Sequence, residues 1–162
     1  MRIYLAGPLG FSEAGRMYHE TVIKPRIEAL GHEMLDPWAL MDAADIEAVV
    51  GLPYGPEKRD RWRVLNGRIG EGNADAIDRC DAVFAVLDGT DVDSGTAAEI
   101  GYACARGKKI LGYRGDFRLS ADNDGSMVNL QVEYFIHRAG GFIITSVSEL
   151  DEALQRLFAF GT

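Results

Sequence analysis

The stretch CDAVFAVLDGTDVDSGTAAEIGYACARGKKIL, Cys80 to Leu111, contains the pattern that decides the fold. Its first part, DAVFAVLDG, has an unbroken apolar run, which is typical of a strand covered on both faces. The part GTAAEIGYACARG then predicts a helix, and KKILGYR predicts the next strand. A strand, a helix and a strand in this order predict a parallel pair of strands joined by a crossover helix.

The same alternation extends in both directions along the chain. Strands are also expected at residues 2–7, 32–37 and 141–146, and helices at 13–30, 60–79 and 146–160. The stretch GLPYGPEK, 51–58, is expected to be a turn-rich loop, and three glycines weaken the helix prediction for 60–79. We therefore expect a single α/β domain, 1–162, with a doubly wound, parallel, five-stranded sheet and helices on both faces, as in flavodoxin or Rossmann-like folds.

The composition limits the class of protein. The chain has 162 residues, of which 47% are hydrophobic and 26% charged, as is ordinary for a soluble globular domain. The net charge of −8 argues against a nucleic-acid partner, because phosphate backbones are bound by clustered Lys and Arg. No apolar run is long enough for a membrane span and no signal peptide precedes the first strand, so we expect a cytoplasmic protein. Cys80 and Cys104 flank no metal-binding motif, and no metal site is expected.

Glu99 is a carboxylate within an apolar helical pattern. The positions three and four residues later hold Tyr102 and Ala103, so no basic residue on this helix can pair with Glu99. In one interpretation Thr96 is the N-cap residue and Glu99 completes a capping box. In the other, Glu99 is a desolvated carboxylate near the positive end of a helix dipole, available as a nucleophile. The sequence alone leaves both interpretations open.

Other polar residues near the expected strand ends have two interpretations as well. Asp93 lies six residues before Glu99 and could cap the helix or bind substrate hydroxyl groups. Tyr4 lies in a buried strand, where its phenol needs a hydrogen-bond partner. Asn73 and Asn129 could each cap a helix. The turn AGPLGF after the first strand could be only a tight turn, or could let a flat ligand approach the backbone.

Together these pieces resemble the nucleoside 2-deoxyribosyltransferase family. The resemblance is carried by IYLAGPLGF, by the stretch quoted above and by DFRLSADNDGSMVNLQ, in the family's order and over most of the chain. It implies an enzyme that transfers 2-deoxyribose between nucleobases, with Glu99 as the nucleophile and Tyr4 orienting it. Asp93 would bind sugar hydroxyls, and Asn129 would reach the 5′-hydroxyl from a neighbouring subunit.

The resemblance has further implications. The substrates would be a deoxynucleoside and a free nucleobase, no cofactor would be needed, and the chain would form a homodimer or a trimer of dimers with shared sites. Gly7, Phe11, Asn73 and Gly95 would belong to the substrate-binding residues. Many family members have an aspartate at the position of Asn73, which is thought to protonate the departing base. Because asparagine cannot act as an acid, the resemblance leaves the base preference open.

Two other functions remain open at this point. The chain could be an N-glycosidase that hydrolyses nucleosides or their 5′-monophosphates, or a non-catalytic nucleotide-sensing module. A carboxylate at position 93 repels a phosphate and favours a substrate with a free 5′-hydroxyl.

The segment 127–136 has two interpretations too. Its apolar residues could form one more helix that covers the sheet. We expect that so small a chain cannot bury all of them in its own core, so that the segment packs against its symmetry mate. These apolar residues are Met127, Val128, Leu130, Val132 and Phe135.

Overall fold

The computed structural model describes residues 1–159. Its five strands form one parallel sheet in the order β2-β1-β3-β4-β5, which confirms the expected doubly wound fold. The strands are β1 (Arg2–Ala6), β2 (Glu33–Leu35), β3 (Ala82–Val86), β4 (Lys109–Tyr113) and β5 (Phe142–Ile144). The expected last helix ran to position 160, which lies outside the described residues, as do 161 and 162 of the expected domain.

The central strand β3 has the sequence AVFAV, and all five of its residues are buried. Its partner β1 is buried from Ile3 to Ala6. The chain runs from β1 outward to β2 and then returns to β3 on the other side of β1. At such a reversal of strand order, the loops at the carboxyl ends of the two strands part and leave a crevice. The sheet thus provides a place for a ligand between β1 and β3.

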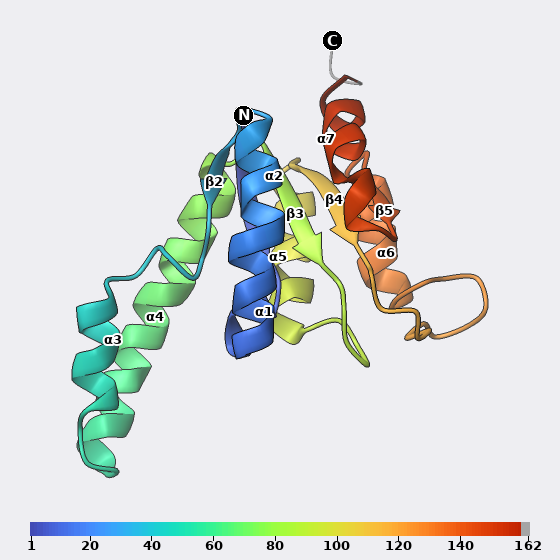
Figure 1. Cartoon of the computed structure of the whole chain (residues 1–162). Helices are drawn as coiled ribbons and strands as arrows, with labels where there is room; N and C mark the ends of the chain where they lie inside the picture. Colours follow the sequence, from blue (N-terminus) through green and yellow to red (C-terminus); the bar gives the residue numbers. More distant parts are fainter. Residues whose placement is uncertain (160–162) are drawn as a thin grey trace.

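Helices cover both faces of the sheet, as expected (Figure 1). One face carries α1 (Glu13–Tyr18), a π-helical turn η2 (His19–Ile23) and α2 (Lys24–Ala29), which follow one another directly, and α7 (Leu150–Ala159). The other face carries α4 (Pro56–Arg79), α5 (Ser94–Ala105) and α6 (Leu130–Arg138). Alternate residues of β1 and β3 point into the two cores, with Tyr4 and Val83 in one and Ile3 and Phe84 in the other.

The region between β2 and β3 differs from the expectation. A helix that the sequence analysis missed, α3 (Ala43–Val50), precedes α4. The helix α4 begins at Pro56, inside the expected loop 51–58, and has 24 residues. Proline is well suited to the first turn of a helix, where its missing N–H has no intrahelical partner. Figure 1 shows α3 and the adjoining half of α4 extending away from the sheet as an arm.

The apolar segment 127–136 is not buried entirely by its own chain, as expected. Val128 and Val132 are buried in the chain's own core, and Met127 and Phe135 are partly buried. Of the five apolar residues considered, Leu130 alone is exposed, at 49%. The segment also forms a covering helix, because α6 packs on α5 and β4.

Within residues 1–159, no helix is both long enough and apolar enough to span a membrane.

Candidate active site

A cavity of about 440 Å³ opens at the carboxyl ends of β1 and β3. Its position is the crevice that the reversal of strand order creates. Cavities of this size suit ligands as large as a nucleoside. The lining residues come from the loops after the first three strands and from three helices: Gly7, Phe11, Pro37, Trp38, Met41, Ile46, Trp62, Ile69, Asn73, Asp93, Gly95, Thr96 and Glu99.

The carboxylate of Glu99 lies at the polar end of this cavity. The phenol of Tyr4 donates a hydrogen bond to its Oε1 over 2.7 Å, and Nδ2 of Asn73 lies 3.5 Å from the same oxygen. These three side chains come from α5, β1 and α4. Tyr4 is fully buried, so its hydroxyl position is fixed by the packing of the sheet. The carboxylate is therefore held in one orientation by groups that are distant in sequence.

Burial and charge change the acidity of both partners. Burial raises the pKa of Glu99, the charge of Asp93 adds to this rise, and the hydrogen bond from Tyr4 opposes it. The net result is a pKa above the ordinary value of a glutamate. Burial, with the neighbouring Glu99 charge, raises the pKa of Tyr4 far above its ordinary value. Tyr4 consequently remains a neutral donor, and the carboxylate of Glu99 is poorly solvated.

The capping-box interpretation of Glu99 is wrong. The N-cap residue of α5 is Asp93, whose Oδ2 accepts hydrogen bonds from the backbone N and the hydroxyl of Thr96, at 2.9 and 3.2 Å. Thr96 thus lies inside the helix, and Glu99 lies in its second turn. Asp93 has the capping role that we considered for it and also lines the cavity.

The two glycines among the expected site residues lie in the cavity lining, as does Phe11. A Cβ atom at Gly7 would lie 2.9 Å from Cβ of Val86, too close for any larger residue without movement of β3. A Cβ atom at Gly95 would lie 3.1 Å from the carboxylate of Asp93. Small residues at both positions keep the backbone near the space that a ligand would fill.

Most of the cavity wall is apolar, and the sequence analysis missed it. The unpredicted lining residues lie in the loop after β2, in α3 and in α4: Pro37, Trp38, Met41, Ile46, Trp62 and Ile69. One signal was present in the sequence, because Trp62 is an aromatic residue in the strongly charged stretch KRDRWR. Such a side chain on a solvated helix face indicates a contact with a ligand or with another element.

Asn129 lies outside this cavity lining. It is the N-cap residue of α6, and its Oδ1 accepts a hydrogen bond from the backbone N of Gln131 at 3.0 Å. Within one chain, then, Asn129 has the capping role that is common for asparagine.

A second, open recess adjoins the polar end of the cavity. The two share Asp93, and the recess is also lined by Asp88, Asp91, Asp116 and Arg118. The guanidinium of Arg118 is already paired with Asp116, with Nε 2.9 Å from Oδ1. The recess therefore carries an excess of negative charge beside Asp93.

A comparison with protein families gave one match, described as Nucleoside 2-deoxyribosyltransferase, over residues 3–131. The match spans every cavity-lining residue and all strands except β5. Among curated proteins, no sequence matched the chain.

Solved structures with the same fold include a 2-desoxiribosyltransferase from Leishmania mexicana. It is 25% identical with a TM-score of 0.64, and the match covers 99% of each chain. A 2-deoxyribosyltransferase from Bacillus psychrosaccharolyticus is 20% identical with a TM-score of 0.62, over 97% of this chain and 96% of the other. A CMP N-glycosidase from Clostridium botulinum is 22% identical with a TM-score of 0.56, over 96% and 98%. The last two identities are low enough that the likeness shows the fold alone.

Proposed function

The chain belongs to the nucleoside 2-deoxyribosyltransferase family, and we propose that it transfers 2-deoxyribose between nucleobases through a covalent intermediate on Glu99. The observation that carries this proposal is the partly buried carboxylate of Glu99, which accepts a hydrogen bond from Tyr4 at 2.7 Å and lines a cavity of nucleoside size. The Leishmania mexicana relative is a 2-desoxiribosyltransferase by its description, which agrees with the proposed reaction.

In this proposal the two ends of the cavity bind the two halves of the nucleoside. The apolar wall with Trp38 and Trp62 receives the flat base, because aromatic side chains bind π-faces by stacking. The sugar lies at the polar end, between Asp93 and Glu99, where carboxylate oxygens accept hydrogen bonds from hydroxyl groups. This orientation brings C1′ of the sugar to the carboxylate of Glu99.

The reaction consists of two displacements at C1′. In the first, a carboxylate oxygen of Glu99 forms a bond to C1′ while the C1′–N bond breaks and its electron pair leaves with the base. The developing oxocarbenium charge is stabilised by the same carboxylate. In the second, a ring nitrogen of the incoming base attacks C1′ and loses its proton to water, while the bond between C1′ and Glu99 breaks and its electron pair returns to the carboxylate. Two inversions retain the β configuration.

Asn73 is expected to contact the departing base. Its side chain lies beside Glu99 and lines the cavity, so its amide can hydrogen-bond a base atom near the scissile bond. An amide has no acidic proton to give, so the departing nitrogen takes its proton from water.

We further propose that the active form is a homodimer or a trimer of dimers. Three large side chains of α5 and α6 are exposed, Tyr102 at 38%, Leu130 at 49% and Tyr134 at 51%. Leu130 and Tyr134 are four residues apart on α6, so they share one face of the helix that Asn129 begins. A second copy that packs here would bring Asn129 of each subunit toward the sugar site of the other, as the family resemblance implies.

Hydrolysis is the competing activity, because a relative with this fold is a CMP N-glycosidase. The recess beside the sugar end argues against a 5′-monophosphate in this chain. Asp88 and Asp91 lie there with Asp93, and like charges would repel a phosphate. A free 5′-hydroxyl has no such cost, so we favour nucleosides as substrates.

The test is incubation with a deoxynucleoside and a second free base, with chromatography for the exchanged nucleoside. The expected result is exchange, together with a peptide containing Glu99 whose mass is increased by one deoxyribosyl group when no acceptor base is present. Release of free deoxyribose without exchange would show a hydrolase. Binding without turnover would show a non-catalytic module, and either result would contradict the proposal.

A further inference from the structure

A buried pair, His19 and Asp36, is not used by the proposed chemistry. Nε2 of His19 lies 3.0 Å from Oδ2 of Asp36, and the two side chains are only 8% and 6% exposed. A charged group at this depth is costly unless it is paired and hydrogen-bonded. The pair lies on the face of β1 opposite Tyr4, close to the loop that follows β2.

A metal ion does not explain the pair. His19, Asp36 and Glu20 do bring possible ligand atoms within 4.8 Å of one another. However, Nζ of Lys24 lies 2.9 Å from the carboxylate of Glu20 and 3.5 Å from that of Asp36, so an ammonium group already supplies the positive charge. Burial alone would raise the pKa of Asp36, but the hydrogen bond with His19 and the charge of Lys24 lower it below its ordinary value. Asp36 is thus an ionised anchor.

The second oxygen of Asp36 reaches toward the proposed substrate site. Its Oδ1 accepts a hydrogen bond from the backbone N of Trp38 at 3.1 Å. The indole of Trp38 lies over Gly10, where the ring leaves no room for a side chain, and packs edge-on against Phe11 with ring centroids 4.7 Å apart. Trp38 and Phe11 both line the cavity with Glu99. One carboxylate therefore links His19 to an aromatic wall of the site.

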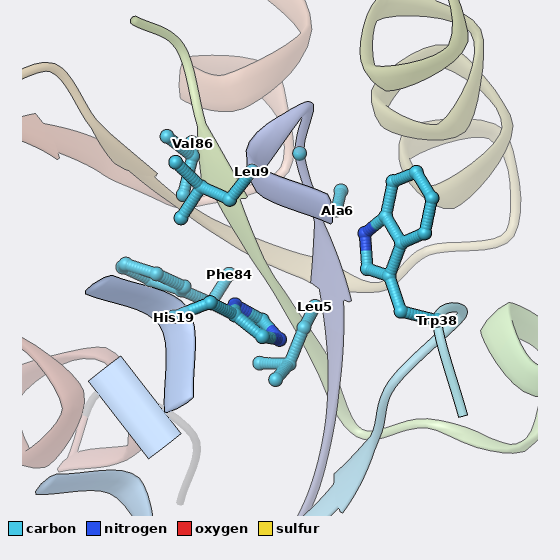
Figure 2. A pocket seen from close by; sticks show the side chains of 8 residues that line it. Leu5, Ala6, Leu9, His19, Trp38, Phe84 and Val86 are labelled. Atoms are coloured by element: carbon cyan, nitrogen blue, oxygen red, sulfur yellow. The ribbon is translucent and has the colours of Figure 1, made fainter. Parts of the chain in front are cut away.

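Little free space remains between the side chains of His19 and Trp38. Figure 2 shows His19 and Trp38 among the side chains around a narrow pocket at the end of β1, with a volume of about 10 Å³. A space of this size holds at most one water molecule, so a change at His19 is transmitted to its neighbours rather than absorbed. His19 also begins the π-helical turn η2, a kind of turn that occurs frequently at functional sites.

We propose that His19 is a positioning residue that acts through Asp36 to hold Trp38 and Phe11 as the base-binding wall of the cavity. This inference rests on the proposed function, in which the base lies against that wall. It assigns His19 an effect on the affinity for the base and none on the transfer step at Glu99. Although Trp38 is 44% exposed, its backbone is held from the buried side by Asp36, and its ring packs on Gly10 and Phe11.

The test separates KM from kcat in the exchange assay. His19→Phe keeps the ring volume but removes the hydrogen bond to Asp36, and loss of a hydrogen bond to a charged group is worth about tenfold or more in an equilibrium constant. We expect KM for the acceptor base to rise about tenfold, with kcat changed less than about twofold. His19→Gln should restore most of the affinity, because its Nε2 can reach the position of the imidazole Nε2. His137→Phe, at an exposed histidine of α6, is the matched control and should leave both constants unchanged.

An unchanged KM in a folded His19→Phe protein would overturn the inference and leave the pair a structural contact. If that variant does not fold, Trp38→Leu decides: a KM that stays at the native value excludes Trp38 from the base site and overturns the inference as well.

A native chain that exchanges no base would instead contradict the proposed function. In that case a Trp62→Phe protein, whose fluorescence comes from Trp38 alone, is titrated with free adenine. If the affinity for adenine, measured by this quenching, is about tenfold weaker in the protein that also carries His19→Phe, the inference is supported. If adenine causes no quenching, or if both proteins bind it equally, the inference is overturned.

Discussion

At the scale of single residues, desolvation of the Glu99 carboxylate lowers the stability of the fold and serves the proposed chemistry. Its carboxylate is desolvated in the folded chain and solvated in the unfolded chain, which is why its pKa is raised in the fold. Ionisation of Glu99 therefore costs stability as the pH rises above the ordinary pKa of a glutamate. Below the ordinary glutamate pKa of about 4.3, both states are protonated and the penalty is absent.

We predict that Glu99→Gln lowers the exchange rate at least about a thousandfold, because an amide is not a nucleophile here. The same variant should melt at a higher temperature than the native chain at neutral pH, and the two melting temperatures should converge as the pH falls below about 4. Thermal unfolding across this pH range checks the second part. Glu71→Gln, at an exposed position of α4, is the matched control and should change neither property. Substantial exchange by Glu99→Gln would rule out the nucleophile assignment.

Tyr4 lowers the pKa of Glu99 by donating a hydrogen bond to its ionised form. Tyr4→Phe removes this stabilisation, so the pKa of Glu99 should rise further and the acid limb of kcat/KM should move to higher pH. We also expect a loss of about tenfold in kcat/KM at the pH optimum, as for a lost hydrogen bond to a charged group. The measurement is a pH–rate profile of both proteins.

The control for this prediction is Tyr18→Phe. The hydroxyl of Tyr18 contacts that of Tyr113 at 3.1 Å on the opposite face of the sheet. Its loss should reduce stability without moving the acid limb. A Tyr4→Phe profile that overlays the native one would contradict the role of Tyr4 in tuning Glu99.

At this scale the residue patterns indicated which side chains are unusual, and only the family resemblance implied that Tyr4 meets Glu99. Glu99 and Tyr4 are 95 residues apart and Glu99 and Asn73 are 26 apart, so no local pattern could show that one carboxylate contacts both. The choice between a cap and a nucleophile depended on which residue begins α5. Asp93 and Thr96 are both good N-cap residues, and only the path of the chain out of β3 selects Asp93.

At the scale of elements, the strands were predictable and the arm was not. The strands are short runs between turn residues, and the central strand β3, which is buried on both faces, has the clearest sequence pattern. The arm consists of α3 and the first half of α4, which pack mainly on each other. The separation of apolar and charged residues along these helices is therefore weak. Ile46 and Trp62 of the arm, with Trp38 and Met41 of the loop before it, line the cavity, and a pattern that assumes one core cannot identify them.

Asn73 provides a prediction for α4. In the proposed reaction it contacts the departing base without protonating it, whereas Asn73→Asp places an acid there. Because the new group must be protonated to assist departure, we expect base release by the variant to acquire a limb that falls as the pH rises. The pH dependence of single-turnover base release measures this. Asn66→Asp adds the same charge at an exposed position two turns earlier in α4 and should leave the profile unchanged. Overlaying profiles for native and Asn73→Asp proteins would exclude a contact with the leaving base.

Gly67 provides a second prediction for the same helix. The sequence analysis counted the glycines at 67, 70 and 72 against a helix, yet α4 continues through all of them. A Cβ atom at Gly67 would have no heavy atom within 4 Å, so alanine fits without strain. Gly67→Ala should raise the free energy of unfolding by about 0.5–1 kcal/mol, because alanine loses less backbone entropy on forming a helix. Urea denaturation tests this, and a decrease in stability would show that something packs on this face of α4.

At the scale of the whole molecule, the order of the strands determines where the cavity lies. The exposed apolar side chains indicate where a second subunit could contribute to it. The βαβ pattern predicted a doubly wound sheet, and ligands in such sheets lie beyond the carboxyl ends of the strands. The strand order, with its reversal between β1 and β3, is known only from the structure. The assembly could not be predicted either. The apolar residues of 127–136 divide between the core and the surface, so their number alone did not show which of them could meet a partner. The exposed side chains of Tyr102, Leu130 and Tyr134 are a better indication, and they are visible only in the folded chain.

The last prediction concerns subunit exchange. If Asn129 acts across an interface, a mixed dimer of Glu99→Ala and Asn129→Ala chains contains one site with a native Glu99 and a native Asn129 from the other subunit. Random mixing makes half of the dimers mixed, so about a quarter of the native exchange activity should return from two inactive proteins. If Asn129 instead acts within its own chain, every site keeps one defect and mixing restores nothing. Loss of the cap also costs about 1 kcal/mol, so Asn129→Asp, which keeps an N-cap oxygen, serves as the control for helix stability. An active monomer at assay concentration, measured by sedimentation, would contradict the shared site, because one chain does not bring Asn129 into the cavity with Glu99.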